Sequence, residues 1–212
     1  IKILKGNKAE LDFKKWVLPS DFNITKSTFK DSELNFEGSE FKEGKNYTNL
    51  IKLQTINTNI NFKESFLKNG INLNNAKILF DRNNGSLIEN KKKFSFKSAV
   101  LGLPNQKKNN IFSNMIIEQE SVFFKTVFLC ETNFENTKFY KNNFTYSSFA
   151  NTGSLNIEFN EDFLKYNSNQ SKSKKINIKE ITLLSFKNST FYENLNMNES
   201  NINVLLLSFE NA

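Results

Sequence analysis

Between Val122 and Phe149 an apolar residue recurs at every fifth position of the chain. The members of this series are Phe124, Leu129, Phe134, Phe139, Phe144 and Phe149. A step of five fits neither regular element, because five residues of a helix advance by about 500° and an odd step in a strand reverses the side chain. A chain that turns a corner after each short segment keeps every member inside, and stacked turns share one core. The series therefore predicts a solenoid with this column of side chains inside it.

Composition does not explain the series. Phe makes up 23 of 212 residues, so four Phe in step arise by chance at about 1 in 7,000 per starting position when matches to the template are counted. A second set of residues lies two positions before the members and is small or β-branched with one exception: Val122, Val127, Thr132, Thr137, Asn142 and Ser147. A narrow interior needs large and small side chains in alternation, and the two sets supply both.

Written in fives, the stretch reads SVFFK, TVFLC, ETNFE, NTKFY, KNNFT and YSSFA. It resembles the pentapeptide-repeat family, whose unit is a small residue, then Asp or Asn, then Leu or Phe, then two variable positions. Thr132-Asn133-Phe134 and Asn142-Asn143-Phe144 come near this form. The sequence departs from the family pattern before the centre of the unit, at Phe123, Phe128, Lys138 and Ser148. The resemblance implies an all-β fold, a right-handed parallel β-helix of quadrilateral section with four pentapeptides to the coil.

The same step recurs in other parts of the chain, so we expect one solenoid domain over 1–212 with coils at 22–80, 112–154 and 177–212. Ile24, Phe29 and Leu34 follow it near the start. Phe186 and Phe191 follow it towards the end and extend the expected core column. The chain also contains 36 Asn, and stacked coils about 4.8 Å apart would allow their amides to form ladders. An AT-rich genome, whose codons favour Asn, is the competing explanation of that number.

Residues 1–21 are expected to form an N-terminal cap with a short helix over 7–19. Asn7 and Glu10 have the spacing of a capping box, Phe13 and Trp16 lie at a helical interval, and Pro19 would end the helix. Such a cap would cover the unpaired backbone groups of the first coil.

Two further segments leave the five-residue pattern and are expected to be insertions at corners of the coil. They span 81–111 and 155–176, and both carry lysines. Insertions in repeat arrays are common binding sites, and the alternative is that these are only solvated loops.

The chain begins at Ile1 and its last residues, 208–212, are a repeat unit cut off as it begins. We therefore expect a fragment that continues past residue 212 with further coils, a capping element or a membrane segment. Within 1–212 there is no run of about 18 apolar residues and no signal-like start, so this piece is expected to be soluble.

Few residues of the chain suit catalysis or metal binding. The chain has no His, which removes Cys/His and Ser/His pairs and His-ligated metal sites. Cys130 is the only cysteine, which is consistent with a reducing compartment, and we expect it to be structural. In the geometry that the resemblance to pentapeptide-repeat proteins implies, its side chain points outward. Glu131 and Glu135, or Glu158, Glu161 and Asp162, are candidate acid/base carboxylates, but proximity in sequence fixes no distance. We expect no enzyme activity, no catalytic or metal-binding residues and no cofactor.

The net charge of +7 bears on the choice of partner. Some pentapeptide-repeat proteins mimic the DNA duplex and bind type II topoisomerases, and such mimicry needs an acidic surface. A basic chain disfavours this alternative unless one face is locally acidic. Nucleic-acid binding through Lys91–Lys93, Lys107-Lys108 and Lys172–Lys175 is also disfavoured, because Arg82 is the only arginine and Lys cannot make bidentate contacts.

These observations favour a non-catalytic bacterial scaffold that mediates protein–protein interaction. One form of this hypothesis is that the chain is the soluble part of a membrane-associated protein. The alternative is a DNA-mimicking binder of a type II topoisomerase. The expected partner is an unidentified protein. Membrane proximity would come through segments beyond this chain, and stacking of coil ends would allow self-association. The expected location is the cytoplasm or the cytoplasmic face of a membrane.

Substitution of Phe139 by Asp tests the expected inward column. An unpaired charge in a narrow core costs several kcal/mol or is neutralised by a shift of its pKa. We expect the Phe139→Asp variant to lose cooperative thermal melting, measured by circular dichroism. A transition that matches that of the unmodified chain would place Phe139 outside the core.

Overall fold

Short strands separated by tight turns make up most of the described chain. The computed structural model describes residues 5–81, 92–103, 109–150, 183–192, 195–203 and 206–212. Inward and outward side chains alternate in these strands, so that in Thr28–Lys30 and Glu33–Asn35 only the central residue is buried. None of the described residues forms a helix, and this part of the chain is all β.

The strands pair in parallel and align in four columns. Column 1 consists of β1 (Lys5–Asn7), β4 (Thr28–Lys30), β8 (Gln54–Ile56), β12 (Lys77–Leu79), β16 (Ile116–Val122), β19 (Lys138–Asn143) and β22 (Thr190–Phe191). Column 2 consists of β2 (Glu10–Asp12), β5 (Glu33–Asn35), β9 (Asn59–Asn61), β13 (Lys93–Ser95) and the second halves of β16 and β19.

Column 3 consists of β3 (Val17–Leu18), β6 (Glu40–Phe41), β10 (Phe66–Leu67), β14 (Val100–Leu101), β17 (Val127–Phe128), β20 (Ser148–Ala150) and β23 (Asn201–Asn203). Column 4 consists of β7 (Thr48–Asn49), β11 (Ile71–Asn72), β15 (Asn110–Ile111), β18 (Thr132–Asn133), β21 (Leu183–Ser185) and β24 (Leu206–Ser208).

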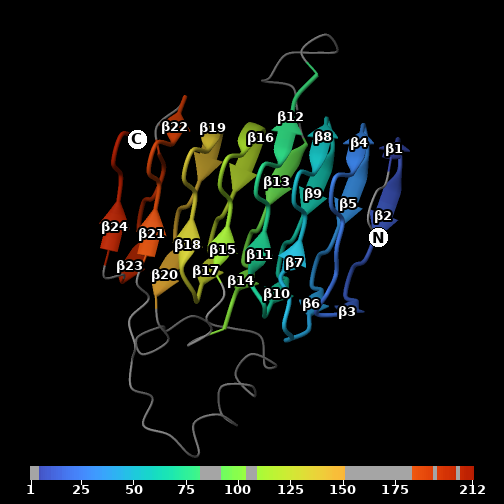
Figure 1. Cartoon of the computed structure of the whole chain (residues 1–212), viewed down its shortest axis with the longest axis horizontal. Coiled ribbons are helices and arrows are strands. Elements are labelled where there is room, and N and C mark those ends of the chain that lie inside the picture. Colours follow the sequence, from blue (N-terminus) through green and yellow to red (C-terminus); the bar gives the residue numbers. More distant parts are fainter. Residues whose placement is uncertain (1–4, 82–91, 104–108, 151–182, 193–194, 204–205) are drawn as a thin grey trace, which may run out of the picture.

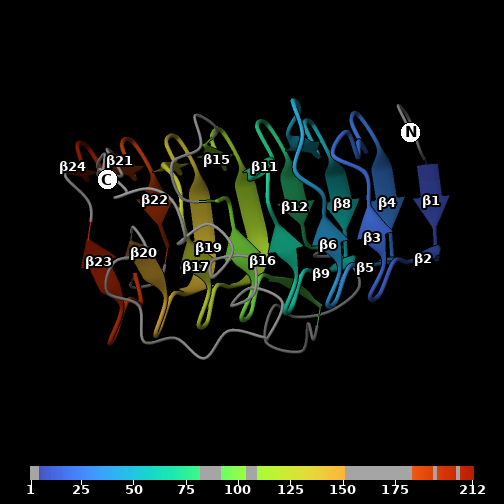
Figure 2. The ribbon, with the colours of Figure 1, turned by 90° about the horizontal axis from the view of Figure 1, so that it is seen from below.

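The chain passes through columns 1 to 4 in order and then returns to column 1. We call one such passage a coil, and the described residues contain seven, the first beginning at β1 and the seventh at β22. Figure 1 shows the coils side by side along the long axis, from the blue N-terminal strands to the red C-terminal ones. Figure 2 shows the same succession after a quarter turn. The expected all-β fold of parallel strands is therefore confirmed, and its form is a β-solenoid.

Corners of the coil are tight turns that hold one residue in the left-handed region. After Phe134, for example, Asn136 has φ +54°, and after Phe123 Lys125 has φ +55°. A hydrogen bond closes such turns, as from the amide of Thr126 to the carbonyl of Phe123 at 3.0 Å. Positive φ at the third residue is typical of a type II turn, where Asn and Gly are favoured over other residues.

Phenylalanine rings of successive coils stack on one another inside the solenoid. The longest stack lies behind column 2 and joins Phe13, Phe36, Phe62, Phe96, Phe123 and Phe144. Its centroid distances run from 4.5 Å to 5.4 Å with interplanar angles of 7° or less. A second stack behind column 4 joins Phe112, Phe134, Phe186 and Phe209. These distances approach the spacing between neighbouring strands, so each ring packs on its counterpart one coil away.

Small hydroxyl residues fill the inward positions beside the rings. Ser65 Oγ donates to the carbonyl of Phe36 at 2.5 Å, and Thr126 Oγ1 donates to that of Phe96 at 2.7 Å. Both hydroxyl residues belong to the coil after the one whose carbonyl they bond. A buried hydroxyl without such a partner would destabilise the core, so these bonds permit polar residues inside.

Asparagine side chains form ladders on the outside, as the composition predicts. Asn61 Nδ2 donates to Asn35 Oδ1 at 3.1 Å, and Asn35 Nδ2 donates to Asp12 Oδ1 at 3.0 Å. At another corner Asn136 Nδ2 donates to Asn114 Oδ1 at 3.2 Å. The amides therefore connect neighbouring coils in addition to the backbone.

The predicted helix over 7–19 is wrong. This segment contains β2 and β3, and β2 pairs in parallel with β5 of the next coil. Phe13 stacks on Phe36 at 5.2 Å, while Trp16 is 57% exposed. The helical interval between apolar residues was coincidental, because packing against a neighbouring coil outweighs local propensity.

The prediction of an insertion over 81–111 is also wrong for the middle of that range. Residues 93–101 contain β13 and β14, which pair with coils on both sides. Phe94, Phe96 and Leu101 are fully buried in the main core. Only 82–91 and 104–108 in this range lie outside the described residues, as does the second predicted insertion, 155–176.

The order of residues in the core column differs from the expected series at its start. Phe134, Phe139, Phe144 and Phe149 are buried in the main core as expected, but Phe124 is only half-buried. Leu129 is buried in a separate small cluster outside it. Their preceding neighbours, Phe123 and Phe128, occupy the core instead, each fully buried. Phe134 follows Phe128 by six positions, so the corner there contains one residue more than a strict step of five allows.

Alanine substitutions at Phe123 and Phe124 test this register with a matched pair. Phe123→Ala should lower the free energy of unfolding by about 3–5 kcal/mol, the cost of a cavity from a buried Phe. Phe124→Ala should lower it by about 1 kcal/mol or less, because that ring is only half-buried and is not part of the main core. Urea unfolding measures both values. Equal losses, or a larger loss at Phe124, would favour the original series.

Candidate interaction surfaces

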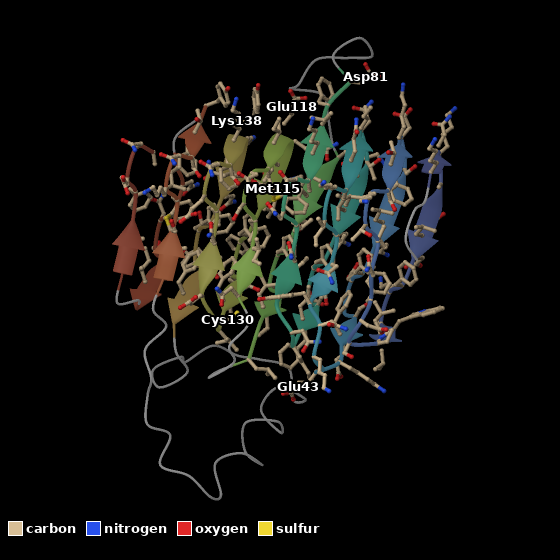
Figure 3. The ribbon with its side chains drawn as sticks, viewed as in Figure 1. Glu43, Asp81, Met115, Glu118, Cys130 and Lys138 are labelled. Atoms are coloured by element: carbon tan, nitrogen blue, oxygen red, sulfur yellow. The ribbon has the colours of Figure 1, made fainter. Side chains whose placement is uncertain are left out.

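Residues of the core column give the solenoid its interior and offer nothing to a ligand. Phe186 is fully buried and Phe191 packs partly buried against the same core. Their side chains contact other rings, with Phe139 stacked on Phe191 at 5.2 Å. Figure 3 shows Met115 likewise among the ribbons, while Lys138 lies at their outer edge. Recognition by this protein therefore depends on outward positions.

Cys130 is buried, so its predicted outward position is wrong. It is 5% exposed and follows β17 at the corner that contains the extra residue (Figure 3). Burial raises the pKa of its thiol to about 12. A Cβ atom on Gly102, which has φ +91°, would lie 2.4 Å from Cys130 Sγ, so the thiol occupies space that only glycine leaves. A protonated, enclosed thiol is a poor nucleophile, and the structural role expected for Cys130 agrees with this environment.

The outer side of column 3 carries a small apolar cluster separate from the main core. It consists of Val100, Val127 and Leu129, with Phe66 packed against them. The first three are 8%, 2% and 1% exposed, so they offer little surface to a partner. On its N-terminal side, Lys68 and Glu40 form an ion pair at 2.6 Å.

The corner between columns 2 and 3 carries a cluster that the sequence analysis did not predict. Lys97, Phe124, Lys125 and Tyr146 belong to successive coils there, and we call them the basic-aromatic ridge. Lys97 Nζ and Lys125 Nζ lie 5.7 Å and 5.6 Å from the centroid of the Phe124 ring. Tyr146 meets the same ring edge-on at 5.7 Å. These distances fall within the range of cation–π contacts and T-shaped aromatic pairs.

Backbone hydrogen bonds fix the ridge to the solenoid. The amide of Ser98 donates to the carbonyl of Phe124 at 2.9 Å, and the amide of Lys125 donates to that of Thr145 at 3.1 Å. Hydrogen bonding to the Glu199 carboxylate, together with its negative charge, raises the pKa of Tyr146. The sequence signal for this cluster is the pair of tripeptides FFK at 123–125 and TYS at 145–147. Each places an aromatic or basic residue at the corner, but this is evident only once Phe123 is assigned to the interior.

The same corner has a different chemistry in the earlier coils. Glu37 lies 3.1 Å from Lys63 Nζ and 3.5 Å from Lys14 Nζ. The hydrogen bond from Lys63, with the nearby positive charges, lowers the pKa of Glu37. Lys63 also pairs with Glu64 at 3.2 Å, so the lysines here are neutralised by carboxylates. The first three coils therefore carry paired charges of both signs at this corner, before the basic-aromatic ridge begins at Lys97.

A second group of outward aromatic residues lies on column 1. Tyr140 and Tyr192 stack at 4.2 Å, and Tyr192 is 54% exposed. Beside them is a cleft of about 790 Å³, with Lys141, Asn142 and Leu195 among the residues that line it. The amide oxygen of Asn142 accepts a hydrogen bond from the Asn196 backbone at 3.0 Å, which places an amide group at the cleft.

The structure describes only some of the candidate chemical groups of the sequence. Ser185 Oγ donates a hydrogen bond to Glu135 at 2.9 Å, and Glu131 is half-buried. Glu158, Glu161 and Asp162 lie outside the described residues. Lys93 pairs with Glu120 at 3.0 Å, whereas Lys91, Lys107-Lys108 and Lys172–Lys175 lie outside the described residues. Among the residues that the structure describes, no group of three Cys, Asp or Glu is placed to hold a metal ion. Nor does that part of the chain contain a helix long and apolar enough to cross a membrane.

Comparison with known proteins adds no relative: no protein-family model matches the chain, and no curated protein matches it either.

The buried thiol predicts a specific pH dependence of stability. Below pH 9 the thiol is protonated in both the folded and the unfolded chain, so its contribution to the free energy of unfolding is fully present. Above pH 9 the thiol ionises first in the unfolded chain, and the free energy of unfolding falls until about pH 12, the pKa in the folded chain. Urea unfolding should show a loss up to about 1.4 kcal/mol per pH unit steeper than in Cys130→Ala. Lys and Tyr titrations are common to both proteins. Parallel pH profiles would mean that the thiol is accessible in the folded state.

Proposed function

We propose that this chain is a non-catalytic scaffold of the pentapeptide-repeat type, whose coil is right-handed and four-sided and whose outer walls bind a protein partner. The four columns of parallel strands and the recurring turns support the architectural part of this proposal. The inward Phe and hydroxyl residues support it further, since they resemble the alternation of large and small residues in the repeat unit. A single continuous core makes the outer walls rigid.

Exposed aromatic residues on these walls carry the functional part of the proposal. Tyr146 and Tyr192 are 44% and 54% exposed, and each is held by another ring, Phe124 or Tyr140. Tyr is enriched in protein interfaces and among the residues that dominate their binding energy. A Tyr already fixed by its neighbours loses little conformational entropy on binding. Two such sites favour recognition of protein over catalysis.

The DNA-mimic alternative has less support. The net charge is +7, and at the corner between columns 2 and 3 Glu37 is paired with two lysines and Glu64 with one. A surface that stands in for a run of phosphates needs unpaired negative charge.

Photo-crosslinking at single positions tests the scaffold proposal in cells that produce the protein. We expect benzoylphenylalanine at Tyr192 or Tyr146 to give discrete crosslinks to another protein, because these rings face outward. The same group at Lys52, an exposed corner residue without an aromatic neighbour among the ring contacts observed, is the control and should give none.

Two results would contradict the proposal. One is the absence of crosslinks to protein from every outward position, and the other is the same products from Lys52 as from the two Tyr positions. Inhibition of DNA supercoiling by a type II topoisomerase at micromolar protein would instead favour the DNA-mimic alternative.

A further inference from the structure

We propose that the basic-aromatic ridge binds an acidic peptide segment of the partner protein, with Lys97 and Lys125 as the ligands of its carboxylates. This inference rests on the proposed function and specifies the chemistry of one site. Two outward lysines of adjacent coils converge on one aromatic ring, which is the observation that carries it.

The Phe124 ring brings two positive charges together without neutralising them. Each ammonium group lies within 5.7 Å of the ring centroid. The ion pairs found in the described chain do not include Lys97 or Lys125, whereas Lys14 and Lys63 of the same corner pair with Glu37. A cation over a ring keeps its remaining donors available and loses side-chain freedom in advance. The ridge is therefore prepared for anions, while the earlier coils of the corner are already neutralised.

Tyr146 gives the ridge an apolar contact surface beside the two charges. Its ring stands at 86° to that of Phe124, and its hydroxyl is oriented by Glu199. Glu199 also sets a limit, because a carboxylate at that end of the ridge repels further negative charge. A segment with acidic residues at one end and an apolar or aromatic side chain at the other fits this order of groups.

A peptide fits the ridge better than a nucleic acid does. Stacking of bases needs an open aromatic face, and the Phe124 ring is engaged by two ammonium groups and the edge of Tyr146. Two lysines neutralise few phosphates, and a nucleic-acid site gains affinity chiefly from many such contacts. Carboxylates accept charge-assisted hydrogen bonds from single ammonium groups and need no longer basic track.

Fluorescence anisotropy with a labelled peptide tests the site. The probe is a fluorescein-labelled octapeptide of four Glu followed by alternating Phe and Ser, titrated with the full chain at low salt. We expect Lys97→Gln with Lys125→Gln to weaken binding by about tenfold, because both charge-assisted contacts are lost. Raising the salt concentration should weaken binding to the unmodified chain and change that of the double variant less.

Lys26→Gln with Lys52→Gln is the matched control. These lysines also occupy one corner in adjacent coils, at φ +53° and +55°, and neither takes part in a cation–π contact within the described part of the chain. The control should bind the probe within about twofold of the unmodified chain, since distant charges are screened. Phe124→Leu keeps an apolar side chain but removes the ring, and it should weaken binding several-fold. Thermal melting confirms that each variant is folded.

Three results would overturn the inference: no binding of the probe, equal weakening in the control, or tighter binding of a labelled fifteen-nucleotide oligothymidine than of the peptide. The last would assign the ridge to nucleic acid. Failure of the ridge is distinguishable from failure of the scaffold. In the Lys97→Gln, Lys125→Gln variant, crosslinks from Tyr192 are measured beside the affinity for the probe peptide. If the crosslinks persist and the affinity equals that of the unmodified chain, the scaffold proposal stands and the ridge is not the peptide site.

Discussion

Parallel hydrogen bonding between successive coils is the constraint on which the rest of the structure depends. It places each residue above its counterpart at the spacing of neighbouring strands, and every other regularity follows from that alignment. Phe36, Phe62 and Phe96 stack because their coils are in register, and the amides of Asn35 and Asn61 meet for the same reason. The basic-aromatic ridge is an outward product of the same alignment, since residues far apart in the chain become neighbours at one corner.

The inward-facing residues could be predicted from the sequence where the five-residue step is uniform, but not where the step is interrupted. The step from Phe134 to Phe149 identified the coil and its inward residues, because a uniform step leaves one register. At Phe123-Phe124 and Phe128-Leu129 two apolar residues stand together, and nothing local says which one faces in. The extra residue at the Cys130 corner determines which of the two residues faces the interior. That corner becomes visible only from the pairing of β17 with β14 and β20.

The candidate sites were hidden for a related reason. Lys97 and Phe124 are 27 positions apart, and no sequence period links them, because coils of this chain differ in length. The helix expected over 7–19 failed in the opposite way. A plausible local pattern was present there, but the second coil offered backbone partners and the Phe36 ring, and these outweighed it. Local patterns are thus informative here only where they repeat from coil to coil.

Trp16 makes the first coil chemically different from the later ones. It occupies the inward position that Ser39, Ser65 and Thr126 occupy in later coils, where a small hydroxyl bonds the preceding coil. An indole at that position offers no such bond and stands more than half exposed against the Phe13 ring. The indole meets the Phe13 ring edge-on at 88°, whereas in the seventh coil the Phe209 ring lies flat on Phe186 at 5°. The repeat is therefore not chemically uniform along its axis, because the first and seventh coils differ in how these aromatic side chains pack.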